Sequence, residues 1–364
     1  MRIISRPIVF SGGGTLGSVM PLVSVIEQFR TRYANEIWWC GTYKGPERNA
    51  LRSLPVRYIP LLGGKWRRYI SWKTIVDLLC IALGFFQSVF LLLSAKPVAI
   101  VSAGSFISVP LLWAAWFLRI PTLALQLDVK IGLANRLVLS SLSQFGSLFP
   151  LPMRSARIAC PVRSAIFALS RERDKMKKEA LARFSFDQKP TILVLGGGIG
   201  AGPLNALIQE SIHSLLLTFN VLHSTGTSVV PRGLQISGYR AQPFFGDDLI
   251  YAYAAADIIV SRAGIGTIAE AAAIKAPLVV IPLPHSPQEH NAALLAKAGA
   301  AAVLPQKSLT SSVFINALTE LLADHASLYA LGVSLHRAIP VDDGSSVIAL
   351  LMSCSPKLIL SEPR

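Results

Sequence analysis

Acidic residues and clustered cysteines are scarce in this sequence. Of its 364 residues only 20 are Asp or Glu, against 35 Lys or Arg, and charged residues make up 15% of the chain. The four cysteines are scattered without a Cys-x-x-Cys spacing, which argues against a zinc site or a disulfide framework and is typical of reduced cytosolic thiols. The first residues run directly into an expected strand, without the apolar stretch and cleavage site of a signal peptide, so we expect none.

The excess of basic residues is concentrated near the start of the chain. The formal net charge is +15, and the first 75 residues hold twelve Lys or Arg but only three Glu. With 52% hydrophobic residues, this composition excludes a disordered chain. A basic bias suits phosphorylated ligands, nucleic acid, an anionic membrane surface or simply a solvated face. Since the sequence has no finger, no RNP-type aromatic strand and no base-reading helix, nucleic acid is not an expected partner.

Short apolar runs alternate with segments of helical length through both halves of the chain. This alternation predicts an α/β fold of two doubly wound parallel sheets. The domains we expect are 1–158, 159–340 and, as a helix that packs back on the first domain with a frayed tail, 341–364. A stretch with Pro, Ser and Arg from 145 to 165 is the expected linker. The expected strands are 8–10, 36–41, 57–61, 99–102, 122–126, 191–195, 220–224, 256–261, 277–282 and 301–304.

Two glycine-rich turns stand where a buried strand passes into a helix, one near the start of each half. Residues 11–18 (Ser-Gly-Gly-Gly-Thr-Leu-Gly-Ser) follow the first strand, and residues 196–201 (Gly-Gly-Gly-Ile-Gly-Ala) follow the strand at 191–195. Glycine lets backbone N–H groups approach a phosphate, and the helix N-terminus adds the positive end of its dipole. The pair of turns predicts two Rossmann-like domains that face each other across a cleft.

The first turn fits two common nucleotide-binding patterns poorly. Its glycines match G-x-G-x-x-G, but an NAD-type site also needs an acidic residue at the end of the second strand. Glu36 lies at the beginning of that strand, and no lysine follows the turn as it does in a P-loop. Dinucleotide binding by the first half is therefore disfavoured.

The second half carries a more specific set of polar residues. The run 261–267 (Ser-Arg-Ala-Gly-Ile-Gly-Thr) ends a strand and opens a helix that contains Glu270. A carboxylate there can bridge two ribose hydroxyls, or it can simply be favourable near a helix N-terminus. The loop at 282–291 offers His285 and His290, but without a clustered carboxylate or cysteine partner we expect no metal.

A basic and aromatic segment precedes a long apolar one. Residues 74–93 are nearly all apolar, and their length approaches the roughly 20 residues that cross a bilayer. A buried core helix, a membrane span and a patch that dips into the lipid surface all fit this composition. We favour the surface patch, because a span would sever a βαβ unit and because a basic and aromatic rim precedes it. The rim consists of Trp66, Arg67, Arg68, Trp72 and Lys73.

In this order, the motifs resemble those of the MurG family of glycosyltransferases over nearly the whole chain. The matching segments are 104–110 (Gly-Ser-Phe-Ile-Ser-Val-Pro), 160–163 (Cys-Pro-Val-Arg), 196–201 with Asn205, 245–249 (Phe-Gly-Asp-Asp-Leu), 261–270 and 284–290. The resemblance implies a GT-B fold and an inverting enzyme that works without a metal or other cofactor. It implies transfer of N-acetylglucosamine from UDP-N-acetylglucosamine to lipid I, the polyprenyl-diphosphate-linked muramyl acceptor of peptidoglycan precursor synthesis.

The resemblance also implies which residues bind the donor. The backbone of Gly246, beside Phe245, would read the uracil edge, and Glu270 would hold the ribose. The other implied donor residues are Arg163, Gly197 and Gly198 for the diphosphate, Ile265, Gly266 and Thr267 for the diphosphate and sugar, and Glu289 and His290 for the sugar hydroxyls.

The acceptor side departs from the family pattern. The family's first turn reads Gly-Gly-Thr-Gly-Gly-His, whereas residues 13–18 place Leu16 inside the turn and Ser18 at the histidine position. The family's His-Glu-Gln-Asn loop is Leu-Gln-Leu-Asp here, at 125–128. Because a carboxylate replaces an amide where the histidine is lost, our hypothesis is that Asp128 is the general base, and Ser18 is the second expected catalytic residue. The implied residues for the acceptor and its diphosphate are Gly13, Gly14, Thr15, Gly17 and Gly104.

The sequence thus predicts a peripheral enzyme on the cytoplasmic face of the cell membrane. Its expected partners are UDP-N-acetylglucosamine, a polyprenyl-diphosphate-linked acceptor and the membrane surface. Two alternatives stay open at this point: an NAD(P)-dependent oxidoreductase, and a non-catalytic UDP-sugar-binding paralogue in envelope assembly.

Overall fold

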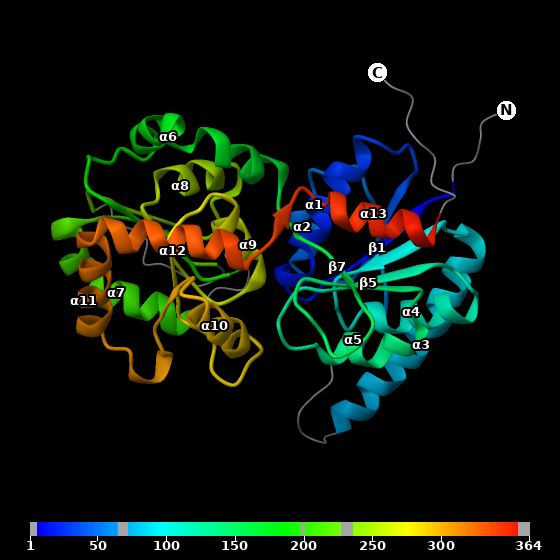
Figure 1. Ribbon diagram of the computed structural model, residues 1–364. Coiled ribbons are helices and arrows are strands. Elements are labelled where there is room, and N and C mark those ends of the chain that lie inside the picture. The colour runs from blue at the N-terminus through cyan, green and yellow to red at the C-terminus, as the bar shows by residue number, and fades with distance from the viewer. Residues whose placement is uncertain (1–5, 65–71, 198–200, 227–235, 356–364) are drawn as a thin grey trace. The chain divides into compact units, whose positions relative to one another are not determined.

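The structure is a computed structural model that describes residues 6–64, 72–197, 201–226 and 236–355. The chain divides into two compact units, the first formed by Met1–Arg163 with Asp342–Arg364 and the second by Ser164–Val341 (Figure 1). Each unit contains a parallel sheet with helices on both faces. This confirms the predicted α/β fold of two doubly wound parallel sheets.

In the described part of the first unit, seven parallel strands run in the order β3-β2-β1-β4-β5-β6-β7. β1 pairs with both β2 and β4, so the order reverses between β1 and β4, and ligands of open α/β sheets bind at the carboxyl end of such a switch point. The strands are β1 (Ile8–Ser11), β2 (Ile37–Gly41), β3 (Arg57–Pro60), β4 (Ala99–Ser102), β5 (Thr122–Gln126), β6 (Gln144–Ser147) and β7 (Ala156–Arg157).

Helices cover both faces of this sheet. α3 (Trp72–Ala95), α4 (Ser108–Phe117) and α5 (Leu133–Val138) share one apolar core with the strands. α1 (Met20–Arg30) packs against α13 (Ser345–Cys354), which returns to the first unit after the whole second unit. The short elements are η1 (Leu16–Ser18), α2 (Glu47–Ala50) and η2 (Leu139–Ser141).

The second unit repeats the arrangement. Its described strands run in parallel in the order β11-β10-β9-β12-β13-β14, with the switch point between β9 and β12. They are β9 (Thr191–Leu195), β10 (Asn220–Ser224), β11 (Tyr239–Gln242), β12 (Ile258–Ser261), β13 (Leu278–Val280) and β14 (Ala302–Val303). Its helices are α6 (Ser164–Phe184), α7 (Gly202–Thr218), η3 (Gly246–Asp248), α8 (Leu249–Ala255), α9 (Ile265–Ala273), α10 (Gln288–Lys297), η4 (Gln306–Ser308), α11 (Ser311–Ala323) and α12 (His325–Ala338).

Part of the expected linker at 145–165 belongs to the first sheet, although the change from the first unit to the second, after Arg163, does lie within this stretch. Residues 145–147 belong to β6, and β7 also lies within this stretch, so both strands extend the first sheet. β6 reads Gln-Phe-Gly-Ser and lacks an apolar run, but its backbone pairs with β5. Residues 159–163 stay with the first unit, where β8 (Cys160–Pro161) pairs with β15 (Val341–Asp342). The first unit therefore ends five residues later than the expected boundary after residue 158.

The apolar segment at 74–93 lies in α3. The window Ile75–Ala95 has a mean hydropathy of 2.3 and is long and apolar enough to cross a membrane, yet only 17% of it is buried. Leu92 packs into the core of the first unit, while Phe86 and Phe90 are exposed. The interpretation of this segment as a buried core helix is therefore wrong. Of the expected rim, Trp66, Arg67 and Arg68 lie outside the described residues, and Trp72 and Lys73 begin α3.

Candidate active site

The first glycine turn lies at the carboxyl end of β1, at the switch point of the first sheet. Gly14 has a φ of +78°, a conformation that glycine adopts without strain. Gly14, Thr15 and Gly17 are exposed, and Gly13 is buried. The hydroxyl of Ser18 is turned back and donates to the carbonyl of Thr15 (3.4 Å).

The loop after β4 contacts this turn, and residues that follow β5 contact that loop. The hydroxyl of Ser105 donates to the carbonyl of Gly13 (3.0 Å), which connects the Gly104 loop directly to the first turn. Gly104 has a φ of +82°, and the side chain of Asn135 packs against it. Asn135 in turn donates to the side-chain oxygen of Gln126 (2.8 Å). The structure thus brings together the acceptor-side segments that follow β1, β4 and β5.

Asp128 lies in the loop that follows β5. The amide nitrogen of Gln126 donates to the backbone carbonyls of Asp128 (2.8 Å) and Lys130 (3.0 Å), which holds this loop in shape. The side chain of Asp128 is half-buried. Asp128 thus lies at the carboxyl edge of the sheet, which is where ligands of such folds bind.

The second glycine turn follows β9, at the switch point of the second sheet. Gly197 has a φ of +85° and is exposed, while Gly198 lies outside the described residues. Behind the turn, Asn205 on α7 donates to the carbonyl of Thr225 (3.0 Å), and its oxygen lies 3.0 Å from Nε2 of His223. Nδ1 of His223 lies 3.0 Å from the hydroxyl of Tyr239. Burial lowers the pKa of His223 to about 4, so this chain of hydrogen bonds holds a neutral imidazole.

Glu270 lies in the second turn of α9. Its oxygen Oε2 accepts a hydrogen bond from the hydroxyl of Tyr253 (2.6 Å), a fully buried residue of α8. α9 begins after Gly264, and its N-terminal N–H groups offer the positive end of the helix dipole to an anion. Ile265 is buried in this first turn.

The remaining predicted donor residues lie on other segments of the two units. Gly266 and Thr267 are half-buried in the first turn of α9. Gly246 begins η3 with a φ of +53° and is exposed, whereas Phe245 is buried with its ring edge against Phe184. Glu289 and His290 are exposed in the first turn of α10, and Arg163 is half-buried at the end of the first unit. In the described ranges, no group of three or more His, Cys, Asp or Glu side chains is placed to hold a metal ion.

Sequence reasoning missed two buried charged residues at these edges. Arg262 follows β12, is buried, and donates to the carbonyl of Ile281 at the end of β13 (2.9 Å). Burial lowers the pKa of its guanidinium. Glu47 is buried against the first glycine turn. The sequence offered no signal for either, because an Arg inside a glycine-rich run and a Glu after a Gly-Pro pair both look like solvated loop residues.

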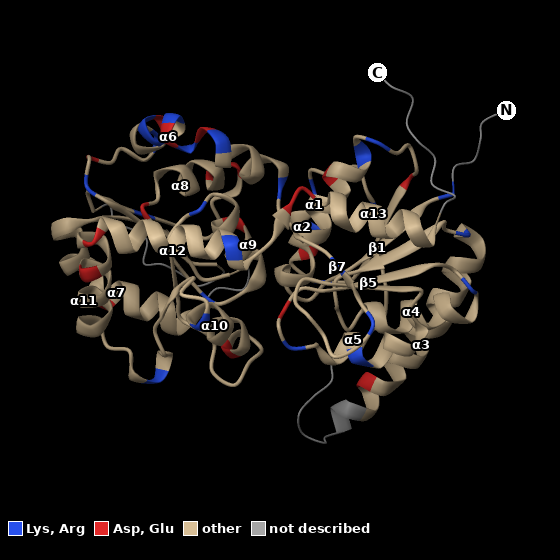
Figure 2. Ribbon diagram, viewed as in Figure 1, with Lys and Arg blue, Asp and Glu red and all other residues tan. Residues whose placement is uncertain are grey.

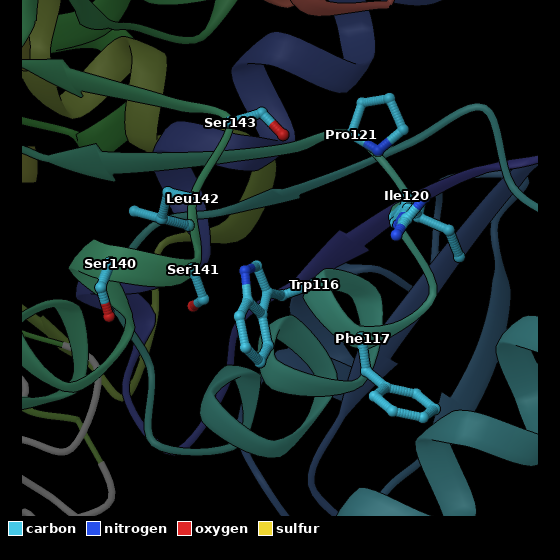
Figure 3. Close-up of a pocket in the computed structure, with 9 residues that line it drawn as sticks. Trp116, Phe117, Ile120, Pro121, Ser140, Ser141, Leu142 and Ser143 are labelled. Carbon is cyan, nitrogen blue, oxygen red and sulfur yellow. The ribbon is translucent and has the colours of Figure 1, made fainter.

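A pocket of about 620 Å³ lies at the opposite edge of the first sheet (Figure 3). Two residues of its wall directly precede strands: Pro121 precedes β5, and Ser143 precedes β6. The pocket therefore lies at the amino end of these parallel strands. Trp116 and Phe117, at the end of α4, line it and are exposed. None of the predicted site residues lies in its wall.

Comparison with known proteins defines the class. Residues 8–143 match the glycosyltransferase family 28 N-terminal domain, and residues 191–334 match the glycosyltransferase family 28 C-terminal domain. A crystal structure of MurG from Acinetobacter baumannii superposes with a TM-score of 0.71 at 23% identity and covers 96% of this chain and 99% of its own. The chain is a glycosyltransferase with the GT-B fold.

Sequence relatives narrow the assignment. A UDP-N-acetylglucosamine--N-acetylmuramyl-(pentapeptide) pyrophosphoryl-undecaprenol N-acetylglucosamine transferase of Treponema denticola is 32% identical over 348 residues, which cover 86% of this chain and 88% of the relative. The enzyme of the same name from Shouchella clausii is 31% identical over 328 residues, which cover 87% and 91%. The chain belongs to this family, the MurG-type N-acetylglucosamine transferases.

Proposed function

We propose that this chain transfers N-acetylglucosamine from UDP-N-acetylglucosamine to a lipid-linked N-acetylmuramyl-pentapeptide, a step of peptidoglycan precursor synthesis. The proposal rests on the names of its relatives and on one observation in the second unit. Glu270 lies on α9 at the switch-point edge, with its carboxylate held by Tyr253 and the positive helix end one turn away. A ribose diphosphate needs this combination of a hydroxyl acceptor and an anion-binding helix end.

The donor occupies the carboxyl edge of the second sheet. Glu270 binds the ribose hydroxyls, and the backbone of Gly246 beside Phe245 reads the uracil. The diphosphate and the sugar are bound by Arg163, Gly197, Gly198, Ile265, Gly266, Thr267, Glu289 and His290. As UDP departs, negative charge builds on its diphosphate, and backbone N–H groups, the helix dipole and a guanidinium stabilise that charge.

The acceptor is bound by the first unit. Gly13, Gly14, Thr15, Gly17 and Gly104 contact the acceptor and its diphosphate. The acceptor hydroxyl oxygen forms a bond to C1 of N-acetylglucosamine while the bond from C1 to the UDP phosphate oxygen breaks, so the configuration at C1 inverts.

Asp128 is the base that takes the proton of the acceptor hydroxyl, and Ser18 is the second catalytic residue. Its place in a loop held by Gln126 supports this role, because a base must be positioned before it can act. Full activity of an Asp128→Asn variant would exclude Asp128 as the base.

The enzyme is peripheral to the cytoplasmic face of the membrane and touches it with α3. Beyond Lys73 the only charged residue of α3 is Asp77 (Figure 2). The exposed large apolar residues in the described part of this helix are Ile75, Val76, Leu78, Leu79, Leu83, Phe86, Phe90 and Leu93. Since burial of apolar surface yields about 25 cal/mol per Å², a face of this kind binds strongly to the lipid interface.

Release of UDP in detergent tests the function. The chain is mixed with UDP-N-acetylglucosamine, with or without lipid I, and UDP is measured by a coupled assay. We expect release that depends on the acceptor. A chain that binds UDP but releases none with the acceptor is a binding protein and not a transferase.

A further inference from the structure

A buried carboxylate lies beneath the first glycine turn. Glu47, the first residue of α2, is 0% exposed and forms no ion pair with any described residue. Burying a carboxylate is costly unless several donors satisfy it. Here the N–H of Thr42 (2.7 Å) and the N–H of Gly14 (3.2 Å) donate to it, together with the hydroxyl of Thr42. The hydroxyl of Tyr58, which donates to the carbonyl of Thr42 (2.5 Å), lies 3.3 Å from Oε1 of Glu47.

Glycines form the space that this carboxylate occupies. A Cβ at Gly13 would lie 2.5 Å from Oε1 of Glu47, and a Cβ at Gly45 would collide with Oε2. A Cβ at Gly41 would lie 2.5 Å from the hydroxyl of Tyr58. The absence of side chains at these positions therefore serves the Glu47 carboxylate, and Gly13 is required whether or not a phosphate binds at the turn.

The peptide group between Gly13 and Gly14 is held at both ends. Its N–H, from Gly14, donates to Oε2 of Glu47 (3.2 Å), and its carbonyl, from Gly13, accepts from the hydroxyl of Ser105 (3.0 Å). With both ends bonded, this peptide cannot rotate without breaking a buried hydrogen bond. The orientation of this peptide therefore fixes the direction in which the backbone continues from Thr15 to Ser18.

The groups around the Glu47 carboxylate come from three adjacent strands of the first sheet. Gly14 follows β1, Thr42 follows β2, and Tyr58 lies in β3. Burial, and then the neighbouring Glu47 carboxylate, raise the pKa of Tyr58, so its phenol stays protonated and donates to the carbonyl of Thr42 beside that carboxylate (2.5 Å). The Glu47 carboxylate therefore joins the segments that follow β1 and β2, with Tyr58 of β3 beside them.

We propose that Glu47 is a positioning residue for the acceptor, acting through the peptide between Gly13 and Gly14. The inference rests on the proposed function, because it assumes that the first turn binds the acceptor. Glu47 touches neither substrate; it sets the direction in which the turn presents Thr15, Gly17 and Ser18. Loss of its charge misplaces the turn, so acceptor binding suffers, while UDP binding in the second unit does not.

A Glu47→Gln variant tests this proposal. The amide keeps the size of the side chain and one oxygen, but its NH₂ group faces a backbone N–H and cannot accept from it. We expect the KM for lipid I to rise about tenfold, equal to about 1.4 kcal/mol, with the Kd for UDP within about twofold of the wild type. Amide hydrogen exchange across residues 12–19 should accelerate in the variant.

Two further variants make the test specific. Glu36→Gln removes an exposed carboxylate of the same unit and should leave the KM and the exchange unchanged. Ser105→Ala frees the other end of the same peptide, so it should raise the KM for lipid I as well. Because both substitutions act on one peptide, the double variant should lose less than the sum of the two single losses.

The outcomes separate this inference from the proposed function. If the wild type releases no UDP with lipid I, the proposed function fails and the inference fails with it. If the wild type is active and Glu47→Gln keeps the wild-type KM, only the inference is wrong. It is also wrong if the variant loses UDP affinity and acceptor affinity in equal measure, because Glu47 then serves general stability.

Discussion

Replacement of Tyr253 by Phe tests the contact between Glu270 and the ribose. The hydroxyl of Tyr253 donates to Oε2 of Glu270 (2.6 Å), and the ring is completely buried. Phe fills the same space, so the substitution removes a hydrogen bond and leaves the packing intact. Glu270 then keeps its place on α9 but loses a partner that orients its carboxylate.

The expected change in UDP affinity depends on the charge of Glu270, which accepts the hydrogen bond from Tyr253. A hydrogen bond to a charged group contributes about 1.5–3 kcal/mol. Glu270 is half-buried, so water replaces part of the lost bond and the lower end of that range applies. Because this bond exists with and without UDP, only the cost of orienting the freed carboxylate enters the Kd, and the lower end of the range is its upper limit. We therefore expect the Kd for UDP to rise by up to about tenfold, since about 1.4 kcal/mol is one factor of ten.

Calorimetric titration with UDP and with 2′,3′-dideoxy-UDP measures this effect. The loss should appear with UDP and vanish with the dideoxy analogue, which lacks the hydroxyls that Glu270 binds. Tyr251→Phe is the matched control, because Tyr251 lies on the same helix with the guanidinium of Arg183 over its ring (4.5 Å) and the substitution keeps that ring. Equal losses with both nucleotides, or no loss with UDP, would refute the assignment of Glu270 to the ribose.

Three further predictions concern stability and the membrane. Because burial lowers the pKa of His223 from 6.5 to about 4, the unfolded chain binds a proton that the folded chain does not. Stability should therefore fall between pH 6.5 and pH 4, by up to about 1.4 kcal/mol per pH unit, and urea denaturation of His223→Gln should lack this slope. Arg262→Lys loses the planar fork that reaches Ile281 and should lower the free energy of unfolding by about 1–2 kcal/mol; an unchanged urea midpoint would contradict the buried contact. Phe90→Asp, on the exposed face of α3, should abolish sedimentation of the protein with anionic vesicles. The control Leu217→Asp, at an exposed leucine of α7, should leave sedimentation unchanged. Equal binding of both variants to the vesicles would contradict the proposal that α3 contacts the membrane.

Much of the fold was predictable because central parallel strands are buried on both faces. β4 and β5 agree with their expected bounds, 99–102 and 122–126, and β9 agrees with 191–195. Such strands read as short apolar runs between helices. β6 and β11 carry polar side chains in Gln-Phe-Gly-Ser and Tyr-Arg-Ala-Gln, and they are strands because a neighbouring strand satisfies their backbone.

The candidate site also has features that the sequence predicted and features that only the structure showed. Both glycine turns were found from the sequence, because glycine runs after a buried strand are a local pattern. The partners that hold the first turn come from distant positions: Ser105 reaches Gly13 across 92 residues, and Glu47 reaches Gly14 across 33. No periodicity or spacing indicates such pairs.

By itself, the sequence determined the two parallel sheets, the glycine turns at their carboxyl edges and the family to which the chain belongs, because these depend on local runs of residues. The tertiary structure decided which groups the turns use. It showed that the Gly14 N–H donates to a carboxylate of the chain itself, that Tyr253 holds Glu270, and that α3 leaves an apolar face exposed. Burial and hydrogen bonding are properties of packed neighbours, and neighbours are set only when the strands are placed side by side.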